Sequence, residues 1–208
     1  MMRSVRRVKA TQWLMALIVA AAPFSFFGCG DDDSDSGGSG DPGHIKVFVT
    51  NGAYTGNFPG GVGLVGADAS CTDVATAAHL AGTWTAWLSD DTTDAIDRIF
   101  DGGTSYQLLN GTTVADSLAD LTDGILDSPI NRNEWGDRIS GSFEVWTSTN
   151  ADGTRKMGTC SNWTDGTDSS TAHDGRADRF DAAWTDSGQT EDCDTFNRLY
   201  CFADATSN

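Results

Sequence analysis

Five cysteines are the residues of this chain with the most distinctive chemistry. One of them follows an apolar run, and four lie beyond residue 70: Cys29, then Cys71, Cys160, Cys193 and Cys201. Thiols pair in oxidising compartments, bind zinc at short spacings, or act as nucleophiles when they stay free. No two of the last four have the Cys-x2-Cys spacing of common structural zinc sites, and no histidine stands near a pair at finger spacing. We therefore expect two disulfides, and the spacing leaves all three connectivities open.

Pairing those four cysteines leaves Cys29 without a partner in the chain. Four basic residues precede a mainly apolar stretch at 13–27, which is typical of a signal peptide and too short for a comfortable membrane span. Gly28 directly precedes Cys29, as in bacterial lipoprotein signals, although Phe26 stands where leucine is usual. We expect residues 1–28 to be a lipoprotein-type signal peptide and Cys29 to carry the lipid. An ordinary cleaved signal peptide with a spare Cys29 is the alternative.

The segment after the apolar stretch is acidic and rich in glycine and serine. Residues 29–43 read CGDDDSDSGGSGDPG, which cannot form a core and predicts a disordered tether. Without residues 1–28 the chain keeps nine basic residues against 30 acidic ones, a formal charge of −21. Such a field repels nucleic acid and heparin-like polyanions, so we expect neither as a partner. Residues 44–208 are long enough for one domain with its own core.

The folded part is expected to be α+β, with a mostly antiparallel sheet, short helices and long loops. Strands are predicted at 44–50, 83–89, 142–149 and 197–203, and a hairpin at 106–115 turns at Asn110-Gly111. A helix is predicted at 67–82, where Gly82 is a plausible stop. The polar segment 164–192 predicts a long surface excursion.

Candidate catalytic and metal-binding groups are few. His79 and His173 could act as catalytic bases only beside a nucleophile, and the sequence has neither a free thiol for them nor a Gly-x-Ser-x-Gly elbow. The segment 148–159 has Ser148 and Thr159 where a calcium loop needs Asp and Glu. Paired carboxylates could hydrolyse glycosides, but 30 acidic residues supply pairs by chance. We assign no catalytic residue, metal or cofactor, and expect no enzymatic activity.

Tryptophans offer the clearest candidate for ligand contact. Four of them lie in predicted strands or apolar blocks and are expected to pack in the core: Trp84, Trp87, Trp146 and Trp163. Trp135 stands instead in the polar sequence NRNEWGDR. An exposed indole there could stack on a sugar ring or anchor a protein contact, and partial burial is the alternative.

Three ordered blocks of this sequence resemble the endostatin-like domain found at the C-terminus of certain collagens. The first is GADASCTDVATAAHLAGTWTAWLS at 66–89, and the second is VWTSTNADGTRKMGTC with Trp163 at 145–163. The third is Cys193 and Cys201, separated by seven residues, with Tyr200 before the last cysteine. The resemblance covers residues 45–203 and is strongest to a bacterial group of exported, lipoprotein-like proteins without an assigned function.

The resemblance implies a C-type-lectin-like fold and two nested bridges, Cys71 with Cys201 and Cys160 with Cys193. It does not carry over the family's ligands. The collagen-derived domain is rich in arginine and binds heparin, whereas this chain is acidic, and only His44 could correspond to the zinc-binding histidines near its N-terminus. The motifs that hold calcium and sugar in C-type lectins are missing, since Pro129 stands in Ser-Pro-Ile and no Trp-Asn-Asp occurs.

These observations together predict a surface-anchored, non-enzymatic binding or adhesion module. We expect it to be exported and to reach the outer membrane or cell surface as a lipoprotein, or otherwise to be periplasmic or secreted. Its partners would be the membrane, through the lipid, and a protein or glycan ligand. A secreted hydrolase and a structural envelope lipoprotein without a small ligand are the alternatives.

Overall fold

The first and last strands lie next to each other in the larger of two sheets. The computed structural model describes residues 43–204, so the predicted signal peptide, Cys29 and the predicted tether up to residue 42 lie outside the described residues. The described sheet has the order β2-β8-β1-β3-β4. Its strands are β1 (Ile45–Val49), β2 (Trp84–Ala86), β3 (Tyr106–Leu108), β4 (Thr113–Ala115) and β8 (Tyr200–Ala203).

The predicted strands of this sheet are confirmed, and so is the hairpin. β3 and β4 pair in the antiparallel sense, and Gly111 takes a φ of 85° at their turn, which favours glycine. β1 pairs antiparallel with β8 but parallel with β3. The sheet is therefore mixed, and the α+β class is as expected.

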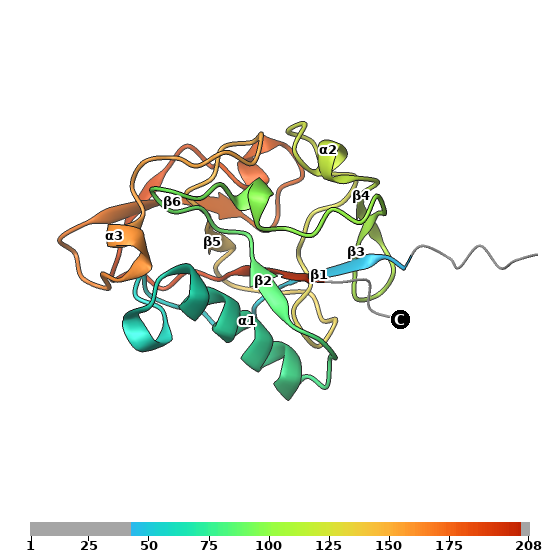
Figure 1. Cartoon of the computed structure of the whole chain (residues 1–208), viewed down its shortest axis with the longest axis horizontal. Coiled ribbons are helices and arrows are strands. Elements are labelled where there is room, and N and C mark those ends of the chain that lie inside the picture. Colours follow the sequence, from blue (N-terminus) through green and yellow to red (C-terminus); the bar gives the residue numbers. More distant parts are fainter. Residues whose placement is uncertain (1–42, 205–208) are drawn as a thin grey trace, which may run out of the picture. The chain divides into compact units, whose positions relative to one another are not determined.

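The helix α1 (Leu64–Ala77) packs against β2 and lies below the larger sheet in the view of Figure 1. It begins earlier and ends earlier than the predicted helix at 67–82. The reason lies at His79, which takes a left-handed φ of 61° and closes the helix before Gly82 can. Two single-turn helices follow, α2 (Leu118–Leu121) and α3 (Cys160–Trp163).

A smaller antiparallel sheet shows that the predicted surface excursion at 164–192 was wrong. This sheet has the order β5-β6-β7, with β5 (Glu144–Trp146), β6 (Thr171–Arg176) and β7 (Thr190–Asp192). β6 reads TAHDGR, yet Asp174 and Gly175 are buried in it. The Ser187 hydroxyl donates to the Asp174 carboxylate, and a Cβ on Gly175 would stand 2.2 Å from the Trp184 carbonyl oxygen. Hydrogen bonding and close backbone packing therefore allow a strand of mainly polar residues to be buried in part.

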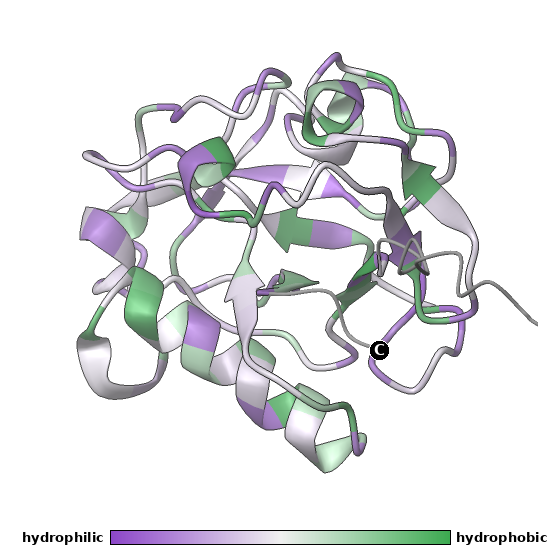
Figure 2. Cartoon of the chain, turned by 45° about the vertical axis from the view of Figure 1, so that its right-hand side comes forward, coloured by the Kyte–Doolittle hydropathy of each residue, from purple (hydrophilic) through white to green (hydrophobic). Residues whose placement is uncertain are grey.

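The core is aromatic, and the prediction that four tryptophans pack in it is confirmed. Each of those four is at most 2% exposed, and Trp184 from the polar segment joins them. The Trp87 indole N–H donates to Thr185, and the Trp163 indole N–H donates to the Ser89 carbonyl. Buried indoles usually find such partners, but the Trp184 N–H has none among the described residues. Figure 2 shows the hydrophobic residues concentrated on the strands and helix turns, with mainly hydrophilic loops around them.

Two disulfides link segments that are far apart in the sequence. Cys71 of α1 pairs with Cys201 of β8, and Cys160 pairs with Cys193. This is the nested connectivity that the resemblance implied. Disulfides persist in oxidising compartments, which indicates a protein that folds outside the cytoplasm. Within residues 43–204, each helix is too short or too polar to pass through a bilayer.

Candidate functional site

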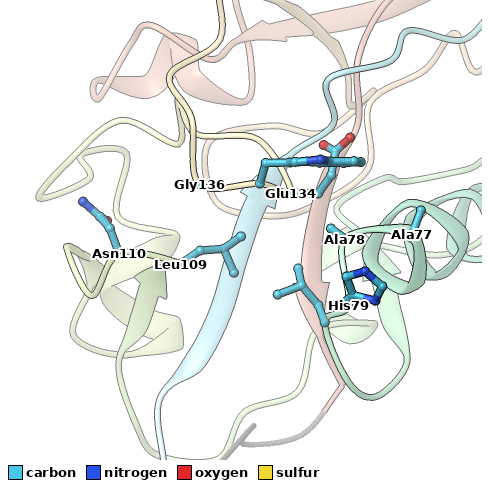
Figure 3. A pocket seen from close by; sticks show the side chains of 9 residues that line it. Ala77, Ala78, His79, Leu109, Asn110, Glu134 and Gly136 are labelled. Carbon is cyan, nitrogen blue, oxygen red and sulfur yellow. The ribbon is translucent and has the colours of Figure 1, made fainter.

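A hollow of ≈ 590 Å³ opens where three distant segments meet. Nine residues line it: Ala77, Ala78, His79, Leu80, Leu109, Asn110, Glu134, Trp135 and Gly136. They come from the end of α1, the β3–β4 turn and the turn at 133–136. In Figure 3, Leu109 and Asn110 stand on one side of the hollow, and Ala78 and His79 stand on the other. The volume lies within the range of small-molecule sites.

The helix wall is shaped by a Schellman motif with an unusual residue in its left-handed position. The Leu80 N–H donates to the Ala75 carbonyl at 2.9 Å, and the His79 N–H donates to the Thr76 carbonyl at 3.0 Å. The residue that donates the second of these bonds is usually glycine in this motif, because a side chain is strained at positive φ. Here it is His79, and its exposed imidazole faces the hollow. His79 thus ends α1 inside the stretch 67–82, where a longer helix was predicted.

The opposite wall is the β3–β4 turn. The Gly111 N–H donates to the Leu108 carbonyl at 2.8 Å, which closes the turn and brings Leu109 and Asn110 to the hollow. The Asn110 Oδ1 accepts a long bond of 3.3 Å from the Thr112 N–H, and among residues 43–204 its amide nitrogen makes no hydrogen bond. This wall therefore offers one apolar and one amide side chain.

The third wall is a turn that presents Trp135. The Asn133 Oδ1 accepts from the backbone N–H groups of Trp135 and Asp137, at 3.1 and 2.9 Å. The Arg132 guanidinium donates to the Gly136 carbonyl at 2.8 Å. The Trp135 side chain is 57% exposed, so the structure has the exposed indole of the two alternatives that the sequence left open. These bonds fix the backbone from which the Trp135 side chain projects before any ligand arrives, which lowers the entropic cost of binding.

Glu134 anchors this turn to the rest of the domain. Its side chain is buried, and its Oε2 accepts from the Asn51 N–H at 2.8 Å. Next to it, Arg198 donates to the carbonyls of Thr50 and Asn51. Burial lowers the pKa of Arg198, and the Glu134 carboxylate opposes that shift. The two charges therefore stabilise each other across the base of the Trp135 turn.

The other sequence candidates lie apart from this hollow. The Nδ1 of His173 is 3.0 Å from the Gln189 carbonyl oxygen, and the side chain of the following Asp174 is held by Ser187. The segment 148–159 forms a tight polar turn, in which the Ser148 hydroxyl donates to the Gly158 carbonyl. Among residues 43–204 no group of three or more His, Cys, Asp or Glu side chains could hold a metal ion.

Sequence reasoning found Trp135 but missed the residues around it. Leu80, Leu109, Asn110 and Glu134 belong to segments with no common motif, and only the fold brings them together. The sequence did indicate two of the walls separately, because Asn110-Gly111 was recognised as a turn and NRNEWGDR as a polar segment. The two segments lie close together because both are attached to β1: the Val49 N–H at its end donates to the Arg132 carbonyl, and β3 pairs alongside it.

Two smaller hollows lie elsewhere on the domain. One of ≈ 440 Å³ combines exposed Phe180 with Phe143, Ile139 and the charged side chains Arg138 and Asp178. A second, of ≈ 370 Å³, is lined by two aspartates and the segment 155–157. In that one the basic side chains already pair with Asp94 and Asp186. Neither hollow joins an exposed tryptophan to uncommitted polar groups, as the Trp135 hollow does.

No protein-family model matches this chain, and no match was found among curated protein sequences. The geometry of the hollow therefore carries the functional argument.

Proposed function

We propose that this protein is a non-enzymatic binding module, held at the cell envelope by a lipid on Cys29, which recognises a protein or glycan ligand through the Trp135 hollow. The observation that carries the proposal is the preorganised, 57% exposed indole of Trp135 in a hollow with polar groups on its other walls. The arrangement favours a glycan, because a sugar ring has an apolar face for the indole and hydroxyls for Asn110 and His79.

The architecture suits the endostatin-like branch of the C-type-lectin-like fold. Support comes from the nested disulfides and from β1 and β8, which pair near the two ends of the domain. The ligand site we propose lies in the Trp135 hollow and needs no calcium, in keeping with the missing calcium motifs.

A hydrolase is less favoured by the same hollow. Glycoside hydrolysis commonly uses two carboxyl groups that flank the scissile bond. Glu134 is the one carboxylate among the nine residues that line the hollow, and it already accepts a backbone hydrogen bond. Such a site can hold a sugar but lacks the second carboxyl group. Turnover of a glycan panel, lost on changing one carboxylate, would revive the hydrolase.

Arrays of glycans and proteins, probed with the purified full-length protein, test the ligand. Binding should fall roughly 30-fold or more in Trp135→Ala, as for a hot-spot aromatic. Phe180→Ala is the matched control, because Phe180 is 56% exposed and lies in another hollow. Equal losses in both variants, or no loss in Trp135→Ala, would contradict the proposal.

The anchor has its own test. Cells grown with a labelled fatty acid should incorporate the label into the wild-type protein and not into Cys29→Ser, which should move from the membrane fraction to the soluble fraction. Labelling that persists in Cys29→Ser would show that the lipid, if any, is attached elsewhere.

A further inference from the structure

Glu134 has a buried carboxylate with one oxygen still available. The residue is 4% exposed, and its Oε2 accepts from the Asn51 N–H. In the part of the chain that the structure describes, no hydrogen bond reaches its Oε1 and no basic side chain forms an ion pair with it. That oxygen is not one of the buried unbonded atoms of the described residues, so it is open to solvent at the hollow, where a charged donor can reach it.

The surroundings of Glu134 add negative charge and aromatic surface. Burial raises the pKa of the Tyr54 hydroxyl, and the carboxylates of Glu134 and Asp73 raise it further, so both lie near that hydroxyl. Trp135 follows Glu134 directly and lines the same hollow. Figure 3 shows the Glu134 carboxylate above His79 and Leu109, at the far end of the hollow from them. This end of the hollow therefore combines one carboxylate with an indole, two groups that attract a cation, and the nearby Arg198 donates to the Thr50 and Asn51 carbonyls without an ion pair to Glu134 in the described residues.

Building on the proposed glycan-binding function, we propose that the hollow selects an amino sugar with a free ammonium group, whose ring packs on Trp135 and whose ammonium binds the Oε1 of Glu134. An N-acetylated sugar has no charge and can give that oxygen only a neutral hydrogen bond, which is about half as strong. The formal charge of −21 on residues 29–208 further concentrates cationic ligands near the surface. Asn110 and His79 on the remaining walls hydrogen-bond the ring hydroxyls.

Two tetrasaccharides that differ only in acetylation test the proposal. Titration calorimetry with the full-length protein should give at least about tenfold tighter binding of the glucosamine tetramer than of the N-acetylglucosamine tetramer. A mildly acidic buffer keeps the amino groups protonated. Physiological ionic strength shortens the Debye length to about 8 Å and suppresses long-range attraction.

Glu134→Gln should reduce this preference to near parity without unfolding the turn, because the amide oxygen still accepts from the Asn51 N–H. Asp137→Asn is the matched control, since it removes one exposed carboxylate from the same turn. Equal weakening by the two variants would mean diffuse attraction and would overturn the role of Glu134. Circular dichroism of both variants identifies any loss of fold.

The outcomes separate this inference from the function on which it rests. An unchanged preference in Glu134→Gln, or equal binding of both tetramers, overturns the ammonium selection even where Trp135→Ala abolishes binding. Trilysine that binds as tightly as the glucosamine tetramer, and competes with it, overturns the assignment to a sugar. The proposed function fails separately, when Trp135→Ala leaves every captured ligand bound.

Discussion

The two disulfides should differ in what they contribute to stability, because they close loops of different length. In the chain-entropy account, a bridge stabilises the fold by restricting the unfolded chain, and the effect grows with the logarithm of the loop. The loop between Cys71 and Cys201 spans 130 residues, and the one between Cys160 and Cys193 spans 33. These lengths correspond to about 5 and about 3.7 kcal/mol at room temperature.

Paired alanine variants turn the difference into a measurement. All four cysteines are fully buried, so replacing either pair removes a similar amount of packing. Cys71→Ala/Cys201→Ala should therefore lose about 1.2 kcal/mol more than Cys160→Ala/Cys193→Ala. With a urea slope of roughly 2 kcal/mol per molar, the midpoints should fall by about 2.5 and about 1.9 M. Because domains are stable by about 5–15 kcal/mol, the long-loop variant stands close to the limit of folding.

Urea titrations followed by circular dichroism compare the two variants with the oxidised wild type. A variant that is already unfolded in buffer can be brought into range with a stabilising osmolyte, applied equally to all three proteins. A short-loop variant that loses as much as the long-loop variant, or more, would refute loop entropy as the main origin of the stabilisation. In that event the contribution would lie in the native contacts around Cys160.

Three further changes test individual positions by urea unfolding. Gly175→Ala should lower the free energy of unfolding by at least about 3 kcal/mol, because its Cβ would stand 2.2 Å from a backbone oxygen. Gly111→Ala has open space around its Cβ and should lose only about 1 to 2 kcal/mol, because of its positive φ. Equal losses in the two variants would contradict the close approach at Gly175. Burial raises the folded-state pKa of Asp174 above its unfolded value near 3.9. The wild type should therefore gain stability relative to Asp174→Asn as the pH falls from about 7 to about 4. A wild type that loses stability relative to Asp174→Asn over this range would refute the shift. His79→Gly should stabilise the domain by about 1 kcal/mol through relief of the left-handed backbone, and a destabilised variant would show that the imidazole has a structural role.

Local patterns predicted the elements wherever the residue types and the environment agreed. The alternation at 44–50 and the Asn110-Gly111 turn lie in β1 and in the β3–β4 hairpin, as expected. The disulfide connectivity was different in kind, because spacing left three possibilities and only the resemblance to a family implied one. The polar neighbours of Trp135 left its exposure open, and only the structure decides between an exposed and a partly buried indole.

What local patterns could not predict depends on contacts made over long distances. β6 was not predicted because Asp174 and Gly175 are residue types that are common in loops. In the structure the Ser187 hydroxyl hydrogen-bonds the buried Asp174 carboxylate, and Gly175 packs closely against the backbone at Trp184. The early end of α1 could not be foreseen either, since a glycine stood nearby and a histidine took the left-handed position. The hollow required three such segments to meet, and no single window of the sequence contains it.

The left-handed residues at α3 and at His79 differ in what holds them. At α3, residues 160–163 all have positive φ, and the surroundings explain it: Cys160 is in a disulfide, and the Trp163 indole is buried and bonded to the Ser89 carbonyl. At His79 the Schellman motif of α1 requires the left-handed backbone, but nothing holds the imidazole, which is exposed and makes no hydrogen bond to any described residue. A histidine at a position that favours glycine fits the contact with the ring hydroxyls that we propose for it. His79→Gly should then bind the ligand less tightly while it folds more stably, a combination that a purely structural histidine would not produce.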